Sequence, residues 1–482
     1  MGAISGRAYL DRIDRLNNEI WLDGKKVEGP ISHHPVFKGL LQEKAALYDL
    51  QLAPEHKPYM TYPSPDSGDP IGLSYMQPKS KENLIIRRKM MELWAKKTFG
   101  MMGRSPDYLN TVLMSFASSA GFLEGKENCF PQNLVAFYKL ARENDLSFTH
   151  TFISPQINRS QLYIENSNEP IALKVVDVLD GGIVVKGARL LATQGGLTDE
   201  VLVFSVGRFL FNEDEAFAFS IPSNTNGVKF ICRDTFTGGT SRFDHPLSSR
   251  YEEMDCLVVF DHVLVPWDRV FYFNNGEVAE QFIKQSCFHA FAKHQVITRQ
   301  IAKTEFVLGI AQLLIDTINI GEYQHIQEKV SEIIVGLETM RALQEKAENS
   351  ASPDQYGIMR PDINPLNVAS VLFPKMYPRF TEILQIIGAS GMITLPTENA
   401  FNSSIRKDLD LYLQGATRSA EDRVKVFRLA WDVTMSSFGT RETQYERYFF
   451  GDPVRLAGNL YKDFPIQPYA DAVSDYLQLK KR

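Results

Sequence analysis

The residues with the clearest chemical potential lie in segment 103–110, GRSPDYLN, where an arginine and a tyrosine are four positions apart. Ser105 followed by Pro106 predicts a helix start, because serine can cap free backbone N–H groups and proline fits the first helical position. Arg104 would then precede the cap and Tyr108 would lie in the first turn, at the electropositive end of the helix. A cation beside a phenol suits an anion, a phenolate or a peroxide as ligand. The alternative is a surface helix whose arginine is solvated.

Bulk composition excludes several classes of partner. The net charge of -6 argues against nucleic acid or an acidic membrane as the main partner. No run of about 18 apolar residues occurs, so we expect no membrane span. The four cysteines are scattered without C-x-x-C spacing, which indicates a reducing compartment, and we expect the cytoplasm.

Metal and nicotinamide sites are not indicated by the sequence. His289 and His294 are five residues apart on an expected helix, which is the wrong offset for a shared face. No G-x-G-x-x-G fingerprint joins a strand to a helix, so we expect the chain not to take hydride from NADH itself.

Three kinds of pattern follow one another along the chain. The first 150 residues or so are typical of helices, with candidates at 82–98, 106–122 and 131–145. Short segments rich in β-branched or aromatic residues then predict strands. These segments are 173–176, 183–186, 201–204, 216–221, 228–232 and 257–260. From about residue 279 the period is that of long helices.

Four apolar stripes predict a four-helix bundle in the last 200 residues or so. The stripes are Ile297, Ile301, Leu308, Ala311, Ile315 and Ile318; Ile326, Val330, Ile333, Leu337 and Met340; Met376, Phe380, Ile383 and Ile387; and Ala420, Val424, Phe427, Trp431, Met435 and Phe438. We interpret these residues as core.

Segment 101–108, MMGRSPDY, closely resembles a motif of the 4-hydroxyphenylacetate 3-monooxygenase family, in its large flavin-using oxygenase component. Similar stretches recur in the same order over about 400 residues, at 46–51, 149–150, 155–159, 185–189, 244–250, 253–256, 265–267, 388–391 and 451–455. The chain is thereby identified as a member of this family. The resemblance implies an α+β, mostly α, acyl-CoA dehydrogenase-like fold. We expect an N-terminal helical domain (1–152), a middle antiparallel β-barrel (153–278), and a C-terminal four-helix bundle with a tail (279–482).

The resemblance also implies an activity in aromatic hydrocarbon catabolism. Family members receive FAD as FADH2 from a separate NAD(P)H:flavin reductase, form a C4a-hydroperoxide with O2, and hydroxylate a phenol ortho to its OH. We expect 4-hydroxyphenylacetate as the substrate and a homotetramer as the assembly. A related dehydratase branch holds an iron–sulfur cluster through two cysteines, where this chain carries Arg104 and Tyr108, which argues against that chemistry.

Residue roles follow from the matched motifs. The resemblance implies Arg104, Tyr108 and His150 as catalytic residues, and Ser105, Ser205 and Val206 join them as substrate contacts. The expected FAD contacts are His150, Thr151, Phe152, Gln156, Ile157, Asn158, Arg159, Thr193, Gln444, Tyr445 and Arg447. We expect no metal ligands.

One departure from the family leaves the substrate open. Some members carry a Ser-Thr pair that contacts the acid tail of the substrate, where this chain has Ser205-Val206, followed by Gly207 and Arg208. Arg208 could anchor a carboxylate instead, and a phenol, chlorophenol or nitrophenol hydroxylase is the close alternative. More distant alternatives are an acyl-CoA dehydrogenase-like oxidoreductase and a non-catalytic helical assembly protein.

Overall fold

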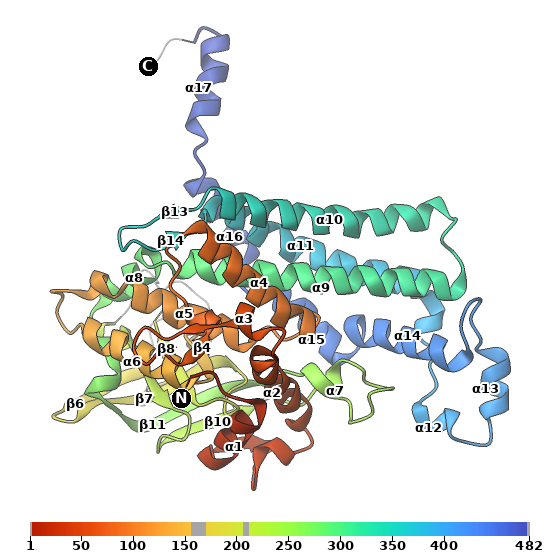
Figure 1. The fold of residues 1–482 in the computed structure, drawn as a ribbon, viewed down its shortest axis with the longest axis horizontal. Helices are drawn as coiled ribbons and strands as arrows, with labels where there is room; N and C mark the ends of the chain where they lie inside the picture. The colour runs from red at the N-terminus through yellow and green to blue at the C-terminus, as the bar shows by residue number, and fades with distance from the viewer. Residues whose placement is uncertain (1, 156–169, 206–211, 480–482) are drawn as a thin grey trace.

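The computed structural model describes residues 2–155, 170–205 and 212–479. Figure 1 shows strands and shorter helices gathered on one side, with the long helices α9 (Phe288–Ile318), α10 (Gln324–Asn349) and α11 (Ile363–Gly388) side by side on the other. The predicted α+β, mostly helical architecture is confirmed.

Helices dominate the N-terminal part, as the sequence predicts. They are α1 (Gly6–Leu16), α2 (Lys38–Leu52), α3 (Lys57–Met60), α4 (Lys81–Lys97), α5 (Pro106–Ser118) and α6 (Pro131–Asn144). Ser80 caps α4 by accepting from the Asn83 N–H, and Pro131 occupies the first turn of α6. Helix α5 ends at Ser118 rather than at 122, because a 3₁₀ turn (Ala120–Leu123) follows it.

Two sheets form the β-rich part. The six-stranded sheet has the order β2 (Lys25–Lys26), β1 (Ile20–Leu22), β10 (Val228–Cys232), β11 (Asp255–Pro266), β7 (Gly182–Thr193) and β6 (Lys174–Leu179). The four-stranded sheet has the order β12 (Val270–Phe273), β9 (Phe217–Pro222), β8 (Glu200–Phe204) and β5 (Phe148–Thr151). Aliphatic and phenylalanine side chains from both sheets share one core.

The pairing differs from a purely antiparallel sheet in two places. Strand β1 pairs in parallel with β10, and β5 pairs in parallel with β8. Strands β1, β2 and β5 come from the region expected to be helical, where each is too short to show an alternating pattern. Because strands from residues 1–152 join sheets of the middle region, the domain limits 1–152, 153–278 and 279–482 stay predictions.

The bundle consists of α9, α10, α11 and α14 (Ala420–Thr434), with a continuous apolar core. The fourth predicted helix is wrong beyond Thr434, because α14 ends there and α15 (Ser437–Tyr448) follows after a break. Phe438 still lies in the bundle core, as predicted, whereas Met435 is exposed. Ser436 caps α15 by accepting from the Gly439 N–H. A Cβ at Gly439 would lie 2.5 Å from the Val433 carbonyl carbon, so the sharp junction requires glycine.

The chain ends in two exposed helices, of which the first lies against α11 and the second projects from the body. Helices α16 (Pro453–Asp463) and α17 (Gln467–Tyr476) contain no buried residue, and α17 projects from the molecule in Figure 1. The remaining helices are α7 (Ser248–Tyr251), α8 (Gly276–Gln285), α12 (Glu398–Phe401) and α13 (Arg406–Tyr412), and β13 (Ser352–Pro353) pairs with β14 (Met359–Arg360). Within the described ranges, no helix is long and apolar enough to cross a membrane.

Candidate active site

The first two residues of the site lie at the start of α5: Arg104 just before the helix and Tyr108 in its first turn. The helix begins at Pro106 with Ser105 as its N-cap residue, as the sequence predicts. The Ser105 hydroxyl makes no capping bond, however, which corrects the expected cap. It donates instead to Asp107 Oδ1 at 2.5 Å, because this carboxylate is buried and needs donors. Gln295 Nε2 supplies a further bond to Asp107 at 3.0 Å.

The Arg104 guanidinium is buried, and no carboxylate in the described part of the chain forms an ion pair with it. Its guanidinium carbon lies 4.4 Å from the Tyr108 ring centroid and 4.3 Å from that of Phe449, with the Tyr445 ring at 5.4 Å. The Nε and NH1 atoms have no hydrogen-bond partner among the described residues. Aromatic faces offset only part of the desolvation of a guanidinium, so these N–H groups are free to bind an anionic or polarised ligand.

His150 lies on β5 among aromatic rings. The Tyr108 ring is 5.8 Å away in an edge-on arrangement, and Phe152 and Phe204 lie at 5.2 Å and 5.9 Å. Neither ring nitrogen has a partner within the described part of the chain, although the side chain is only 2% exposed. Buried polar atoms are normally paired, so two unpaired nitrogens on one ring indicate a ligand position.

Burial sets the protonation of both ring systems. Desolvation, followed by the charge of Arg104, holds the pKa of His150 well below its ordinary value of 6.5, so the imidazole is neutral at pH 7. A neutral imidazole offers one donor and one acceptor. Burial also raises the pKa of Tyr108, so that residue keeps its phenolic proton. We call Arg104, Tyr108, His150, Tyr445 and Phe449 the unpaired cluster.

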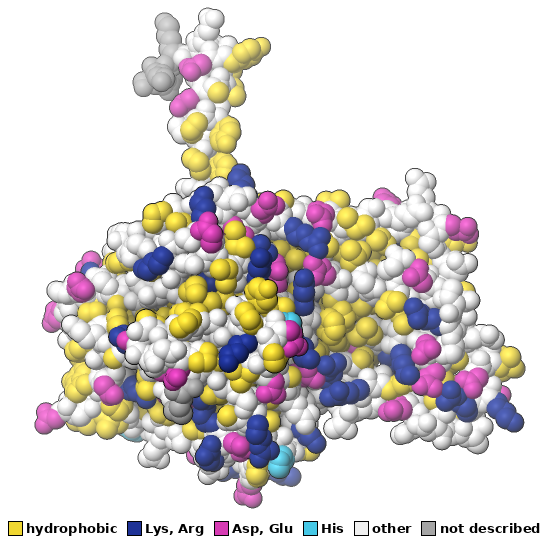
Figure 2. Space-filling view, in the orientation of Figure 1, with side chains coloured by type: hydrophobic (Ala, Val, Ile, Leu, Met, Phe, Trp, Pro, Cys, Tyr) yellow, Lys and Arg dark blue, Asp and Glu magenta, His cyan; other side chains and the backbone are white. Residues whose placement is uncertain are grey.

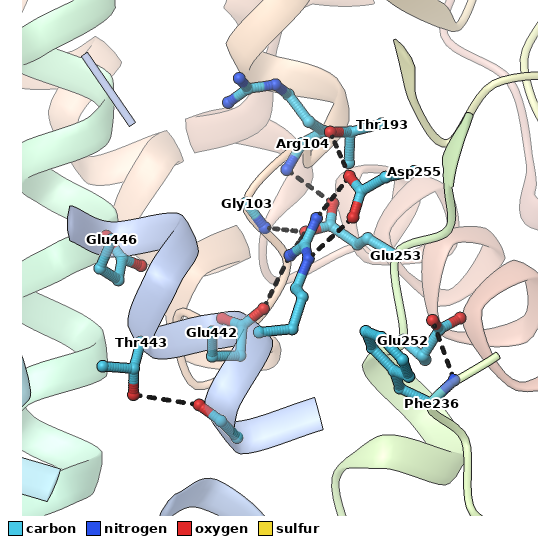
Figure 3. A network of polar contacts seen from close by, with 12 residues as sticks. Gly103, Arg104, Thr193, Phe236, Glu252, Glu253, Asp255, Glu442, Thr443 and Glu446 are labelled. Atoms are coloured by element: carbon cyan, nitrogen blue, oxygen red, sulfur yellow. Dashed lines mark hydrogen bonds and ion pairs between the residues drawn. The ribbon is translucent and has the colours of Figure 1, made fainter. Parts of the chain in front are cut away.

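Glu253 fixes the backbone that carries Arg104. Its carboxylate accepts the N–H groups of Gly103 and Arg104, each at 2.7 Å (Figure 3). Gln194 donates to the same carboxylate at 2.8 Å and to the Arg104 carbonyl at 3.0 Å. A Cβ at Gly103 would lie 2.3 Å from a Tyr445 ring carbon, so only glycine fits there. The position of Arg104 is therefore determined from both sides.

Arg441 connects Glu253 to further buried charges. It binds both oxygens of Asp255 at 2.8 and 3.0 Å and Glu442 Oε1 at 2.8 Å, and it lies 3.7 Å from Glu253 Oε2. Lys303 bridges Glu442 and Glu446 at 2.6 Å each. We call Glu253, Asp255, Arg441, Glu442, Lys303 and Glu446 the ionic network.

The pKa values of the network follow from its pairing. Burial raises the pKa of Asp255, but Arg441, Arg233 and Thr193 outweigh burial and hold it at about 2. Burial likewise opposes ionisation of Glu446. The charges of Arg299 and Lys303 outweigh this effect and hold the pKa of Glu446 well below its ordinary value. Asp255 and Glu446 are thus ionised and paired at neutral pH.

Sequence reasoning missed the network as a unit. Glu253 and Asp255 were recognised only as part of a family motif, and Arg441, Glu442 and Lys303 were not singled out. The sequence does contain a signal for two charged helix faces. Arg299 and Lys303 are four residues apart on one expected helix, and Glu442 and Glu446 have the same spacing in the C-terminal part of the chain.

The predicted FAD contacts divide into three groups. His150 and Tyr445 belong to the unpaired cluster, where Tyr445 contacts Arg104, and Phe152 adjoins it through its contact with His150. Thr151 and Thr193 are nearby but engaged: Thr151 Oγ1 donates to the Leu190 carbonyl and Thr193 Oγ1 to Asp255, each at 2.8 Å.

Gln444 and Arg447 form the third group, which the structure does not bring to the cluster. They lie on the outer side of α15, where their side chains contact each other at 3.5 Å. Gln156, Ile157, Asn158, Arg159, Val206 and Arg208 lie outside the described residues.

Ser205 is buried, and its hydroxyl already donates to the Glu215 carbonyl at 2.5 Å.

Arg189 on β7 carries another buried guanidinium, of which only part is hydrogen-bonded within the described residues. Its NH1 donates to Ser154 Oγ at 2.6 Å, whereas Nε and NH2 have no partner among the described residues. Burial lowers the Arg189 pKa to about 10, so it remains a cation. Such a group can bind a phosphate or a carboxylate. No group of metal-ligating side chains is found in the described ranges.

Comparison with known proteins covers nearly the whole chain. Residues 5–272 match the family model described as 4-hydroxyphenylacetate 3-hydroxylase N terminal, and residues 279–478 match the corresponding C terminal model. The chain is 61% identical to the probable 4-hydroxyphenylacetate 3-monooxygenase of Bacillus subtilis, over 99% of both chains.

Solved structures agree with the family models. The oxygenase component of 4-hydroxyphenylacetate 3-monooxygenase, complexed with FAD and 4-hydroxyphenylacetate, superposes with a TM-score of 0.94 at 44% identity, over 99% of this chain and 98% of that one. An archaeal 4-hydroxybutyryl-CoA dehydratase shares the fold, with a TM-score of 0.89 at 18% identity over 100% and 96% of the two chains.

Proposed function

The chain belongs to the 4-hydroxyphenylacetate 3-hydroxylase family, and on this premise we propose that it is the oxygenase component of a two-component flavin monooxygenase. The reaction is hydroxylation of 4-hydroxyphenylacetate ortho to its OH, giving 3,4-dihydroxyphenylacetate. The observation that carries the proposal is the unpaired cluster, in which buried nitrogens of Arg104 and His150 beside Tyr108 have no partner among the described residues.

The cluster can hold a phenol and polarise it. Neutral His150 can accept the phenol proton in a hydrogen bond, which increases electron density at the ortho carbon. Tyr108 can donate to the same oxygen and so hold the phenol in position. Arg104 stabilises negative charge that develops as an oxygen atom reaches the ring. The surrounding phenylalanines exclude water from the reacting groups.

The residues present also fit FAD. Reduced FAD, when bound, supplies the activation of O2 that the amino acids cannot provide. Thr151, Phe152, Thr193 and Tyr445 are its proposed contacts near the cluster, together with residues 156–159. The Nε and NH2 of Arg189, which have no partner in the described part of the chain, suit an anionic part of the cofactor or substrate. Gln444 and Arg447 stay proposed contacts although they lie on the outer side of α15.

A second substrate class is supported by Ser205. Its hydroxyl is engaged with the Glu215 carbonyl, so it is not free to bind the carboxylate of 4-hydroxyphenylacetate. Phenol, chlorophenol or nitrophenol, which lack that carboxylate, are therefore the alternative substrates.

We also propose partners and a location. A separate NAD(P)H:flavin reductase supplies the reduced flavin. A homotetramer is supported by the projecting helix α17, whose side chains Tyr469, Val473 and Tyr476 are 59–86% exposed. Figure 2 shows hydrophobic groups in yellow on this projection. The cytoplasm is supported by four unpaired cysteines.

Turnover with a supplied reductase tests the proposal. The protein is mixed with a flavin reductase, NADH, FAD and each phenol in turn, and catechol formation is compared with NADH consumption. We expect 3,4-dihydroxyphenylacetate in near-stoichiometric yield, and slower reaction with the other phenols. Peroxide release without any catechol, whichever phenol is added, would overturn the proposal.

A further inference from the structure

Two cysteines face each other across adjacent strands of the six-stranded sheet. Cys232 ends β10 and Cys256 lies at the start of β11, and the two residues are direct partners in the antiparallel register. Their sulfurs are 3.6 Å apart. Cys256 is 2% exposed, whereas Cys232 is half-buried, so that an oxidant in solvent reaches Cys232 first.

The backbone at this pair suits a disulfide. The next pair along is joined by the Arg233 N–H and the Asp255 carbonyl at 3.3 Å, so Cys232 and Cys256 form the pair without direct backbone bonds. Such pairs have Cα atoms about 4.5 Å apart, within the range of disulfides. Closing the bond therefore requires rotation of side chains rather than separation of the strands.

We infer that Cys232 and Cys256 are a dithiol that hydrogen peroxide oxidises to a disulfide. Cys232 attacks one peroxide oxygen and becomes a sulfenic acid, releasing water. Cys256 then attacks the Cys232 sulfur, the S–S bond forms, and a second water leaves with the hydroxyl and the thiol proton. Overall two thiols lose two electrons and two protons to one peroxide. Reduced flavin and O2 are a source of peroxide whenever oxygen transfer fails; this source rests on the proposed function, while the thiol chemistry does not.

The disulfide would act on the turn that supports Arg104. The Cys256 thiol now contacts the Gly195 carbonyl at 3.6 Å, and the Gln194 N–H donates to the Met254 carbonyl at 2.7 Å. A disulfide has no thiol proton, so the hydrogen bond from Cys256 to the Gly195 carbonyl would be lost. Gln194 in turn holds the Arg104 carbonyl and Glu253, so oxidation loosens a contact of the unpaired cluster.

Thiol counting tests the inference without turnover. The full-length protein without added flavin is treated with hydrogen peroxide, quenched, denatured and assayed for free thiols, and peptides are identified by mass spectrometry. We expect the wild type to lose two of its four thiols and to yield a Cys232–Cys256 crosslinked peptide. Dithiothreitol should restore all four.

Two variants make the result decisive. Cys129→Ser removes another half-buried cysteine, which has no sulfur neighbour among the described residues, and should still form the crosslink. Cys232→Ser should lose thiols at least about tenfold more slowly. In the reductase-coupled assay, wild-type turnover should fall as the crosslink forms and recover with dithiothreitol, while Cys232→Ser keeps its turnover. Equal thiol loss in Cys232→Ser, or loss without a crosslinked peptide, would overturn the inference. Full turnover of the crosslinked protein would refute the link to Gln194.

Discussion

Two buried polar regions meet at residues 103–104 and differ in how their charges are satisfied. In the ionic network every charged atom of Glu253, Asp255 and Arg441 has a partner. In the unpaired cluster, Arg104 and His150 are also buried, but their side chains keep nitrogens that have no partner within the described ranges. Fully paired groups position the backbone, whereas unpaired groups that the same backbone holds in place are available to a ligand.

The difference has an energetic side. A buried charge that loses its partner costs several kcal/mol, whereas one that has no partner to lose already carries that cost in the folded state. Substitutions in the ionic network should therefore lower stability most, whereas substitutions in the unpaired cluster should lower catalysis most.

Removing Arg441 should give the largest effect. Arg441→Met removes the cation nearest to Glu253 and one of the two arginines that pair with Asp255, which keeps Arg233. We expect a loss of about 3–5 kcal/mol in the free energy of unfolding. Denaturant unfolding monitored by tryptophan fluorescence measures it. Arg447→Met, on the outer side of the same helix, is the control and should change stability by no more than about 0.5 kcal/mol. A loss below about 1 kcal/mol for Arg441→Met would remove the distinction between the regions.

Removing Arg104 should reverse the pattern. Arg104→Met deletes a donor for developing charge, so we expect kcat/KM for hydroxylation to fall about 10²–10³-fold. Stability should stay the same or increase, because a desolvated cation is replaced by an apolar side chain. Arg104→Lys keeps the positive charge but not the planar guanidinium. Its kcat/KM should therefore lie between those of the wild type and Arg104→Met. Strong destabilisation with normal turnover would place Arg104 in the structural class.

The protonation of His150 predicts a pH effect of intermediate size. Its folded-state pKa lies below 6.5, so as pH falls through 6.5 the unfolded chain takes up a proton that the folded chain refuses. Stability contributed by neutral His150 is therefore present above 6.5 and is lost below it, by about 1.4 kcal/mol at pH 5.5. Unfolding free energies of wild type and His150→Phe, measured between pH 8 and 5.5, isolate this loss. Parallel curves would show that His150 titrates normally.

Tyr445 should give the smallest effect. Its buried hydroxyl has no hydrogen-bond partner among the residues that the structure describes, so Tyr445→Phe should leave the stability of the ligand-free protein unchanged. If this hydroxyl binds flavin, affinity for FAD should fall about 2–10-fold, corresponding to one hydrogen bond. Fluorescence titration measures the affinity. Lower stability with unchanged affinity would place Tyr445 with the ionic network.

The sequence predicts this fold well where local signals are strong. The start of α5 follows from Ser105-Pro106, and the long bundle helices follow from their apolar period. The α14–α15 junction was missed because its apolar spacing continues through Met435, while the turn depends on a close backbone approach at Gly439. Strands β1, β2 and β5 are too short to show a period.

The site was predictable in its ligand-facing residues and not in its support. Arg104, Tyr108 and His150 belong to motifs, and the structure brings them together. Arg441 and Lys303 act through partners distant in sequence, such as Asp255, and one sequence does not reveal which charges will be buried against each other. Gln444 and Arg447 match a motif, yet they lie outside the cluster.

The most direct test of the central claim is a crystal structure of this protein with FAD and 4-hydroxyphenylacetate bound. The account predicts the phenol oxygen within hydrogen-bond distance of His150 and Tyr108, with the free nitrogens of Arg104 facing the flavin or the phenol. A substrate bound elsewhere, with His150 and Arg104 still unpaired, would contradict it.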